Sequence, residues 1–260
     1  MVGVSAASLS QRSVPSHVLR PPPPPPPQPH RLVRSVCCLS SGLSTPPLVE
    51  QTLSRILSSG VIACLRANSA EMAMEAARAA VSAGISVLEI VVSTPGVFEV
   101  IQQLVDDHPA TVFGAGTVLN VEDAKKATNA GAKFIMSPAM VKDIMDDYQT
   151  GEVLYMPGVM TPTEVYPVSA LGGIKYISAL KKPFSHISMV ASQGITIDSV
   201  GEYIALGASS VVLSDAIFNK EALRQNNFNE IYQLAHFAAL QGKEAVERKR
   251  KFMSNLSHQG

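Results

Sequence analysis

The sequence predicts an α/β fold, a (β/α)₈ barrel of parallel strands (a TIM barrel) in which one unit is truncated. From Val61 onward, short apolar runs alternate with amphipathic stretches of helical spacing, a pattern typical of repeated βα units. The runs are apolar on both faces, as expected of strands covered by helices. The alternation breaks at residues 160–164, which alone separate two strand-like runs. Because parallel strands need a crossover of about a dozen residues or more, either the pattern changes there or a helix and most of a strand are absent. We expect the second, with the fifth helix and most of the sixth strand missing.

The individual elements follow from this alternation. The expected strands are 61–66, 87–93, 111–117, 133–138, 153–159, 186–193 and 209–215, with a stub of another at 165–167. The expected helices are 71–83, 97–107, 121–130, 141–148, 174–180, 199–206 and about 221–242. Glycines at 84 and 131 end two of these helices. The barrel therefore spans 49–242, and residues 243–260 form a polar tail that extends the last helix into solvent.

Residues 1–48 differ in composition from the rest. They contain no Asp or Glu, several arginines and serines, and an unbroken proline run at 21–27. Prolines in a row favour an extended polyproline conformation that cannot enter a core. Arg- and Ser-rich, acid-free N-termini are typical of organelle transit peptides. We expect import into a chloroplast or other plastid, with cleavage near 36–41; the alternative is a generic disordered tail on a cytoplasmic protein.

The overall composition excludes several function classes. Lys plus Arg equals Asp plus Glu at 21 each, and the absence of a basic patch argues against a nucleic-acid partner. No run approaches the roughly 18 apolar residues of a membrane helix, so no membrane partner is expected. The cysteines are Cys37, Cys38 and Cys64, and none has metal-ligand spacing with another Cys or His. We therefore expect no metal and no cofactor.

Active sites of (β/α)₈ barrels lie at the carboxyl ends of the strands, which directs attention to a few polar residues. Glu89 lies within an apolar strand, where a desolvated carboxyl group is suited to proton transfer; the alternative is a structural ion pair. Arg66 ends the first strand and either binds a substrate carboxylate or caps a loop. Thr117 ends the small-residue stretch 114–117, which allows close backbone approach.

A phosphate site is expected where the last two strands end, since barrels frequently bind phosphate there through backbone N–H groups. Ordinary tight turns are the alternative for each segment. The candidate residues are Gly172, Gly173, Gln193, Gly194, Ser214 and Asp215.

Motifs along residues 50–220 resemble, in order, the 2-keto-3-deoxy-6-phosphogluconate (KDPG) / 4-hydroxy-2-oxoglutarate aldolase family. The motifs are VIACLRANS, VLEIVVSTP, GAGTVLN, FIMSPAM, YMPGVMTPTE and ASQGI. The resemblance implies a metal-free class I aldolase on a (β/α)₈ barrel, usually a homotrimer. Such an enzyme splits a phosphorylated keto acid into pyruvate and glyceraldehyde 3-phosphate through a Schiff base.

The resemblance also assigns roles to individual residues. It implies that Glu89 is the general acid/base and that Arg66 and Thr117 bind the keto acid. Ser93, Ser137 and Pro138 complete the expected substrate site, with Ser93 where many members have an arginine. The segment 192–194 stands where the family often has T-G-G.

The family's Schiff-base lysine has no counterpart in this chain. The family continues after T-P-T-E with a helix and a strand that ends in the lysine, whereas here Glu164 runs directly into Val165. Lys175, Lys181 and Lys182 are expected to face solvent. We therefore expect little or no aldol cleavage. Two alternatives remain: a non-catalytic subunit that assembles with intact aldolase, and a different phosphate-binding barrel enzyme.

Overall fold

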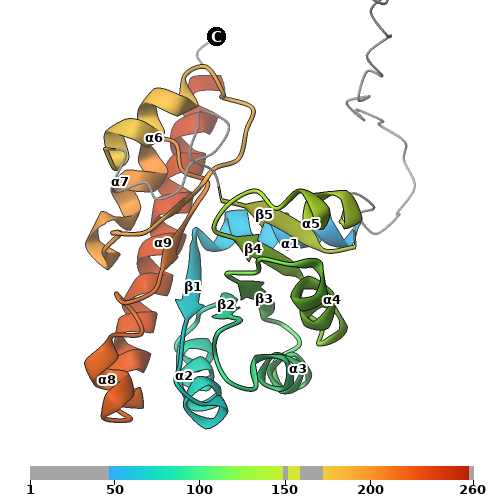
Figure 1. Ribbon diagram of the computed structural model, residues 1–260. Coiled ribbons are helices and arrows are strands. Elements are labelled where there is room, and N and C mark those ends of the chain that lie inside the picture. The colour runs from blue at the N-terminus through green and yellow to red at the C-terminus, as the bar shows by residue number, and fades with distance from the viewer. Residues whose placement is uncertain (1–46, 149–151, 159–171, 258–260) are drawn as a thin grey trace, which may run out of the picture. The chain divides into compact units, whose positions relative to one another are not determined.

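A single curled sheet of seven parallel strands organises the domain (Figure 1). The computed structural model describes residues 47–148, 152–158 and 172–257. The strand order is β5-β4-β3-β2-β1-β7-β6. In chain order the elements are α1 Leu48–Ser59, β1 Val61–Leu65, α2 Ala70–Ser82, β2 Val87–Val91, α3 Val97–Asp107, β3 Val112–Gly116, α4 Val121–Asn129, β4 Phe134–Ser137, α5 Lys142–Asp147, β5 Leu154–Pro157, α6 Ile174–Lys181, β6 Val190–Ser192, η2 Ile197–Ser199, α7 Val200–Ala205, β7 Ser210–Leu213, α8 Lys220–Arg224 and α9 Phe228–Ser257.

The expected strands are found within one or two residues for most of the sheet, and every pairing is parallel. The architecture is a half-barrel rather than a closed (β/α)₈ ring. Among the described residues, β5 pairs only with β4, and β6 only with β7. The expected stub at 165–167 lies outside the described residues. An α/β fold with a curled parallel sheet is therefore confirmed.

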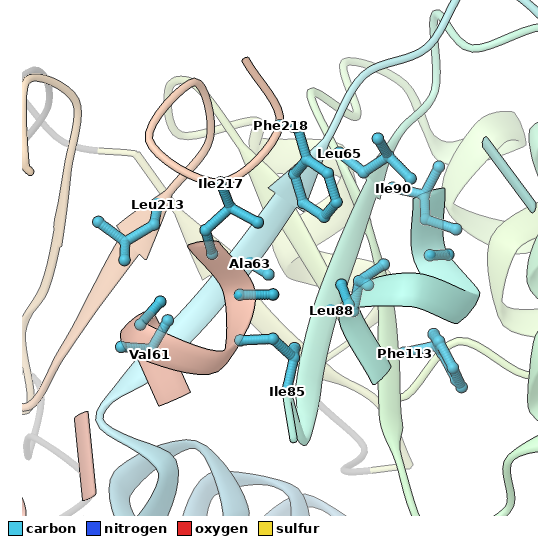
Figure 2. Packing of buried hydrophobic residues seen from close by; sticks show 14 of the residues in the cluster. Val61, Ala63, Leu65, Ile85, Leu88, Ile90, Phe113, Leu213, Ile217 and Phe218 are labelled. Atoms are coloured by element: carbon cyan, nitrogen blue, oxygen red, sulfur yellow. The ribbon is translucent and has the colours of Figure 1, made fainter. Parts of the chain in front are cut away.

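The strands present different side chains to the two faces of the sheet. The outward residues pack against the surrounding helices; Figure 2 shows Ala63, Leu88, Ile90 and Phe113 in this layer. The inward residues form a second, smaller cluster, of which Phe134 and Val212 are members. Because side chains alternate along a strand, the inward positions of β1 and β2 include Cys64 and Glu89. The fold thus directs a thiol and a carboxyl group into the concave face.

Helix α1 was not expected from the sequence. Its Ile56 is buried and belongs to the inward cluster with the strand residues Ile62 and Val87. The helix therefore packs against the concave face of the half-barrel and is part of the folded domain.

The C-terminal region also differs from the expectation. In place of one helix over 221–242, the chain forms the short α8, a break at 225–227, and the long α9. Helix α9 packs along α1, α2 and α7 (Figure 1). It continues through the segment expected to be a solvated tail: Ala245 and Val246 are buried, and Lys249 Nζ donates to Ala208 O at 2.9 Å. The first part of that segment is therefore part of the packed domain.

Candidate active site

The carboxyl ends of the strands and the concave face of the sheet border one cavity of about 1450 Å³. The candidates that the sequence indicated and that lie on its wall are Arg66, Glu89, Thr117, Ser137, Pro138, Gln193, Gly194, Ser214 and Asp215. The fold thus brings residues from both halves of the chain around one space.

Glu89 lies at the centre of β2 with its carboxyl group turned into the concave face. The side chain is buried, and the adjacent strand β3 makes room for it with Gly116, where an added Cβ would lie 1.5 Å from Glu89 Oε1. Burial raises the pKa of Glu89 from 4.5 to about 7, against smaller lowering effects of a hydrogen bond from Cys64 and the charge of Arg66. A carboxyl group with this pKa can both give and accept a proton near neutral pH.

Arg66 follows β1 at the mouth of the cavity. Its Nη1 donates to Ser93 Oγ at 2.9 Å, and the next residue is anchored because Ala67 N donates to Thr94 Oγ1 at 3.2 Å. Ser93 is not on the described cavity wall, although the sequence indicated it as a substrate residue. In this structure Ser93 supports Arg66, whose guanidinium lies on the wall.

Thr117 has an unusual backbone conformation directly after β3. Its φ is 59°, a left-handed value that is strained for a β-branched residue. The strain is held by the following residue, because Val118 N donates to Met136 O at 3.0 Å and Val118 O accepts from Ser137 Oγ at 2.7 Å. Strained residues of this kind concentrate at functional sites. The hydroxyl of Ser137 therefore maintains the turn that presents Thr117 to the cavity.

The expected phosphate residues are only partly brought together. Gln193 and Gly194, after β6, have φ values of 75° and 69° and lie on the wall with Ser214 and Asp215, which follow β7. Gly172 and Gly173 precede α6 and are not on the described wall. Their expected place in the phosphate site stays a prediction.

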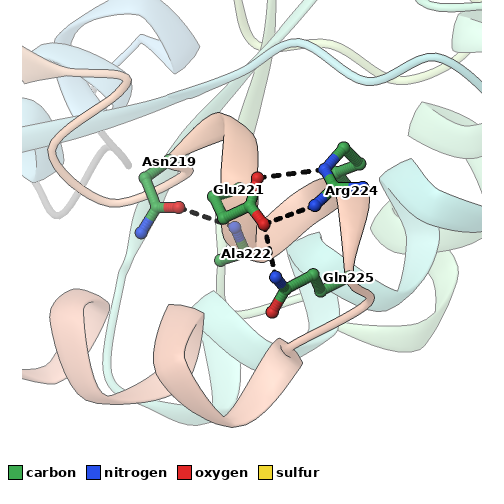
Figure 3. A network of polar contacts seen from close by, with 5 residues as sticks. All are labelled: Asn219, Glu221, Ala222, Arg224 and Gln225. Carbon is green, nitrogen blue, oxygen red and sulfur yellow. Dashed lines mark hydrogen bonds and ion pairs between the residues drawn. The ribbon is translucent and has the colours of Figure 1, made fainter.

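Two basic residues on the wall were missed by sequence reasoning. Lys220 and Arg224 both belong to α8, which begins where Asn219 Oδ1 accepts from Ala222 N at 2.6 Å (Figure 3). The Arg224 guanidinium is paired with Glu221 through contacts of 3.0 and 2.6 Å. Lys220, the first residue of α8, therefore places an amine on the cavity wall. The sequence pattern did not reveal this position because it depends on the turn at 214–219.

All lysines of the chain fall within the described residues. They are Lys125, Lys126, Lys133, Lys142, Lys175, Lys181, Lys182, Lys220, Lys243, Lys249 and Lys251. Of these only Lys220 lines the cavity, and its side chain is at an exposed position. Lys175 and Lys182 are exposed, and Lys181 Nζ donates to Ile187 O at 2.7 Å.

Neither a metal site nor a membrane span is found within the part of the chain that the structure describes. No group of three or more His, Cys, Asp or Glu side chains there could hold a metal ion. No described helix is both long and apolar enough to span a bilayer.

Comparison with known proteins identifies the family. The model of the family described as KDPG and KHG aldolase matches residues 53–234. This chain belongs to that family. The KHG/KDPG aldolase of Escherichia coli K12 is 28% identical over 206 residues, covering 74% of this chain and 93% of the relative. The 2-dehydro-3-deoxy-phosphogluconate aldolase of Dickeya dadantii is 29% identical over 198 residues, covering 71% and 93%.

Solved structures agree with this assignment. The KDPG aldolase of Legionella pneumophila, with pyruvate captured as a covalent carbinolamine intermediate, is 26% identical and has a TM-score of 0.66. The match covers 72% of this chain and 97% of that protein. Tryptophan synthase subunit alpha from Legionella pneumophila is 14% identical at a TM-score of 0.59, which reflects the fold alone. An aldolase-type function, with a small keto acid as substrate, is thus supported at the level of the family.

Proposed function

We propose that this chain retains the family's 2-keto-acid site and its proton-transfer residue but lacks the nucleophile of aldol cleavage. The parent activity is that of an aldehyde-lyase that cleaves KDPG to pyruvate and glyceraldehyde 3-phosphate. In this proposal the chain as written binds the keto acid and has weak cleavage activity or none.

The keto-acid site rests on three side chains around one cavity. Arg66 offers a guanidinium suited to a carboxylate. Thr117 presents its hydroxyl from a strained turn, and Glu89 places a carboxyl group of pKa about 7 beside them. The burial of Glu89 in the cavity wall is the observation that carries the proposal, since burying an ionisable group is costly and raises its pKa into the range of proton transfer near neutral pH.

The expected loss of aldol cleavage follows from the positions of the lysines. In a class I aldolase an iminium on a lysine takes up the electrons released as the C–C bond breaks. Glu89 moves protons but cannot act as that electron sink. Lys220 is the only lysine on the cavity wall, and its exposed position lacks the desolvation that activates an amine.

The phosphate end of the substrate would lie at Gln193, Gly194, Ser214 and Asp215, with Lys220 as a counter-charge. By resemblance to the family we also propose a homotrimer, testable by sedimentation, and import into plastids through residues 1–48. Fusion of that segment to a fluorescent protein tests the location, and a cytoplasmic signal would contradict it.

Two assays test the function together. Pyruvate binding is measured by calorimetry, and KDPG cleavage is followed by release of pyruvate. A variant with the E. coli relative's helix–strand segment inserted between Glu164 and Val165 serves as the matched comparison. We expect the unaltered chain to bind pyruvate without cleaving KDPG, and the restored variant to cleave it. Efficient cleavage by the unaltered chain, or no pyruvate binding by either protein, would refute the proposal.

A further inference from the structure

The thiol of Cys64 lies in the site but has no part in the proposed chemistry. It lies on the inward face of β1, in direct register with Glu89 of β2. Both side chains line the cavity. Cys64 packs with the inward apolar cluster and keeps some exposure because it borders the cavity. The thiol and the carboxyl group therefore face each other across one strand pair.

Cys64 has two polar neighbours. The thiol interacts with the carboxyl group of Glu89 and with the hydroxyl of Ser214, which follows β7, and all three side chains line the cavity. On its other side the Glu89 carboxyl group touches Gly116 of β3, which leaves no room for a Cβ. The Cys64 side chain from β1 and the backbone of β3 thus confine the carboxyl group from two sides.

The protonation of the sulfur decides what it can do. Burial raises the pKa of the Cys64 thiol well above its usual range, and the adjacent charge of Glu89 raises it further. A thiol that stays protonated is a poor nucleophile but remains a hydrogen-bond donor. In these surroundings the Cys64 thiol is not expected to attack the keto acid, but it can donate a hydrogen bond to the Glu89 carboxylate.

We propose that Cys64 is a positioning residue, whose S–H donates to the Glu89 carboxylate and holds it against Gly116 in the orientation used for proton transfer. The inference rests on the proposed function, because it assigns Cys64 a purpose in the same site. Ser214 orients the thiol by donating to the sulfur, so that the thiol proton points to Glu89. A cysteine that only filled space would leave the titration of Glu89 unchanged when replaced by another side chain.

The test is the titration of Glu89 in the full chain without ligand, followed by the infrared band of the protonated carboxyl group. The difference from Glu89→Gln assigns the band. Cys64→Ala removes the donor, Cys64→Val removes it while keeping volume, and Cys64→Ser restores a donor. Val212→Ala is the matched control, because it trims another cavity-lining member of the inward cluster. The charged groups on the wall, which are Arg66, Asp215, Lys220 and Arg224, are kept in every variant.

Loss of a donor to the charged form favours the neutral acid. We expect Cys64→Ala and Cys64→Val to raise the Glu89 midpoint by at least about 0.5 pH unit, Cys64→Ser to return it near the unaltered value, and Val212→Ala to leave it in place. An unchanged midpoint in both apolar variants, or an equal rise in Val212→Ala, overturns the inference. Pyruvate binding by the unaltered chain is measured separately, so that failure of the keto-acid site is distinguished from failure of the Cys64 assignment.

Discussion

Replacing Glu89 by Gln should make the protein more stable, and increasingly so as the pH rises. The folded-state pKa of Glu89 is raised from 4.5 to about 7 by burial. Between these two values the folded chain keeps a proton that the unfolded chain has lost. The unfolding free energy therefore falls as the pH rises through this window, and the loss is complete above about pH 7.

The size of the effect follows from the same pKa. From 4.5 to about 7 is roughly 2.5 pH units, and each unit is worth about 1.4 kcal/mol, so ionised Glu89 lowers the unfolding free energy by about 3 kcal/mol. Glu89→Gln removes this cost and keeps an amide of similar shape beside Cys64. Relative to the unaltered chain, the variant should gain about 3 kcal/mol between pH 4.5 and pH 8.

Urea unfolding of both proteins at several values from pH 4 to pH 8.5 measures the difference. Glu99→Gln is the matched control, because Glu99 is exposed in the first turn of α3. A difference for Glu89→Gln that stays constant across the range would refute the reasoning, as would a gain of equal size in Glu99→Gln.

Three further substitutions test other parts of the account. Gly116→Ala places a Cβ 1.5 Å from Glu89 Oε1, so it should lower the unfolding free energy in urea by about 1–3 kcal/mol. The control is Gly201→Ala on α7, which should lower it less because the nearest neighbour there is the end of a flexible arginine side chain. Equal losses in the two variants would contradict the contact between Gly116 and Glu89. Arg66→Ala should weaken pyruvate binding in calorimetry about tenfold or more, through loss of a charge-assisted bond, whereas Arg78→Ala, paired with Asp107 on the outer helices, should leave it unchanged. Ile56→Ala should lower the unfolding free energy by about 2–5 kcal/mol, because α1 is an integral part of the domain. Leu48→Ala, at an exposed position of the same helix, should change it little. Similar small losses in both variants would show that α1 is dispensable.

The order of the elements and the main site residues could be predicted from the sequence for physical reasons. Apolar runs such as 87–93 must be buried on both faces, and they alternate with helix-spaced segments. A single carboxylate inside such a run is conspicuous because its burial is costly, which is why Glu89 was found. Helix α1 was missed because its burial depends on a contact with the concave face, where Ile56 packs, and no local pattern reports that contact.

Other features of the site depend on three-dimensional relations that no sequence pattern contains. Cys64 lies beside Glu89 because of the register in which β1 pairs with β2. The place of Lys220 on the wall follows from the turn after β7. The resemblance assigned Ser93 to the substrate site, and the structure adds that its hydroxyl accepts a hydrogen bond from Arg66.

Borohydride reduction of the full chain in the presence of labelled pyruvate, followed by peptide mass spectrometry, measures directly whether any lysine forms a Schiff base. We expect pyruvate to bind without leaving a reduced adduct on any lysine, and Lys220→Arg to behave like the unaltered chain. A stable pyruvyl adduct on Lys220 or on another lysine would contradict it.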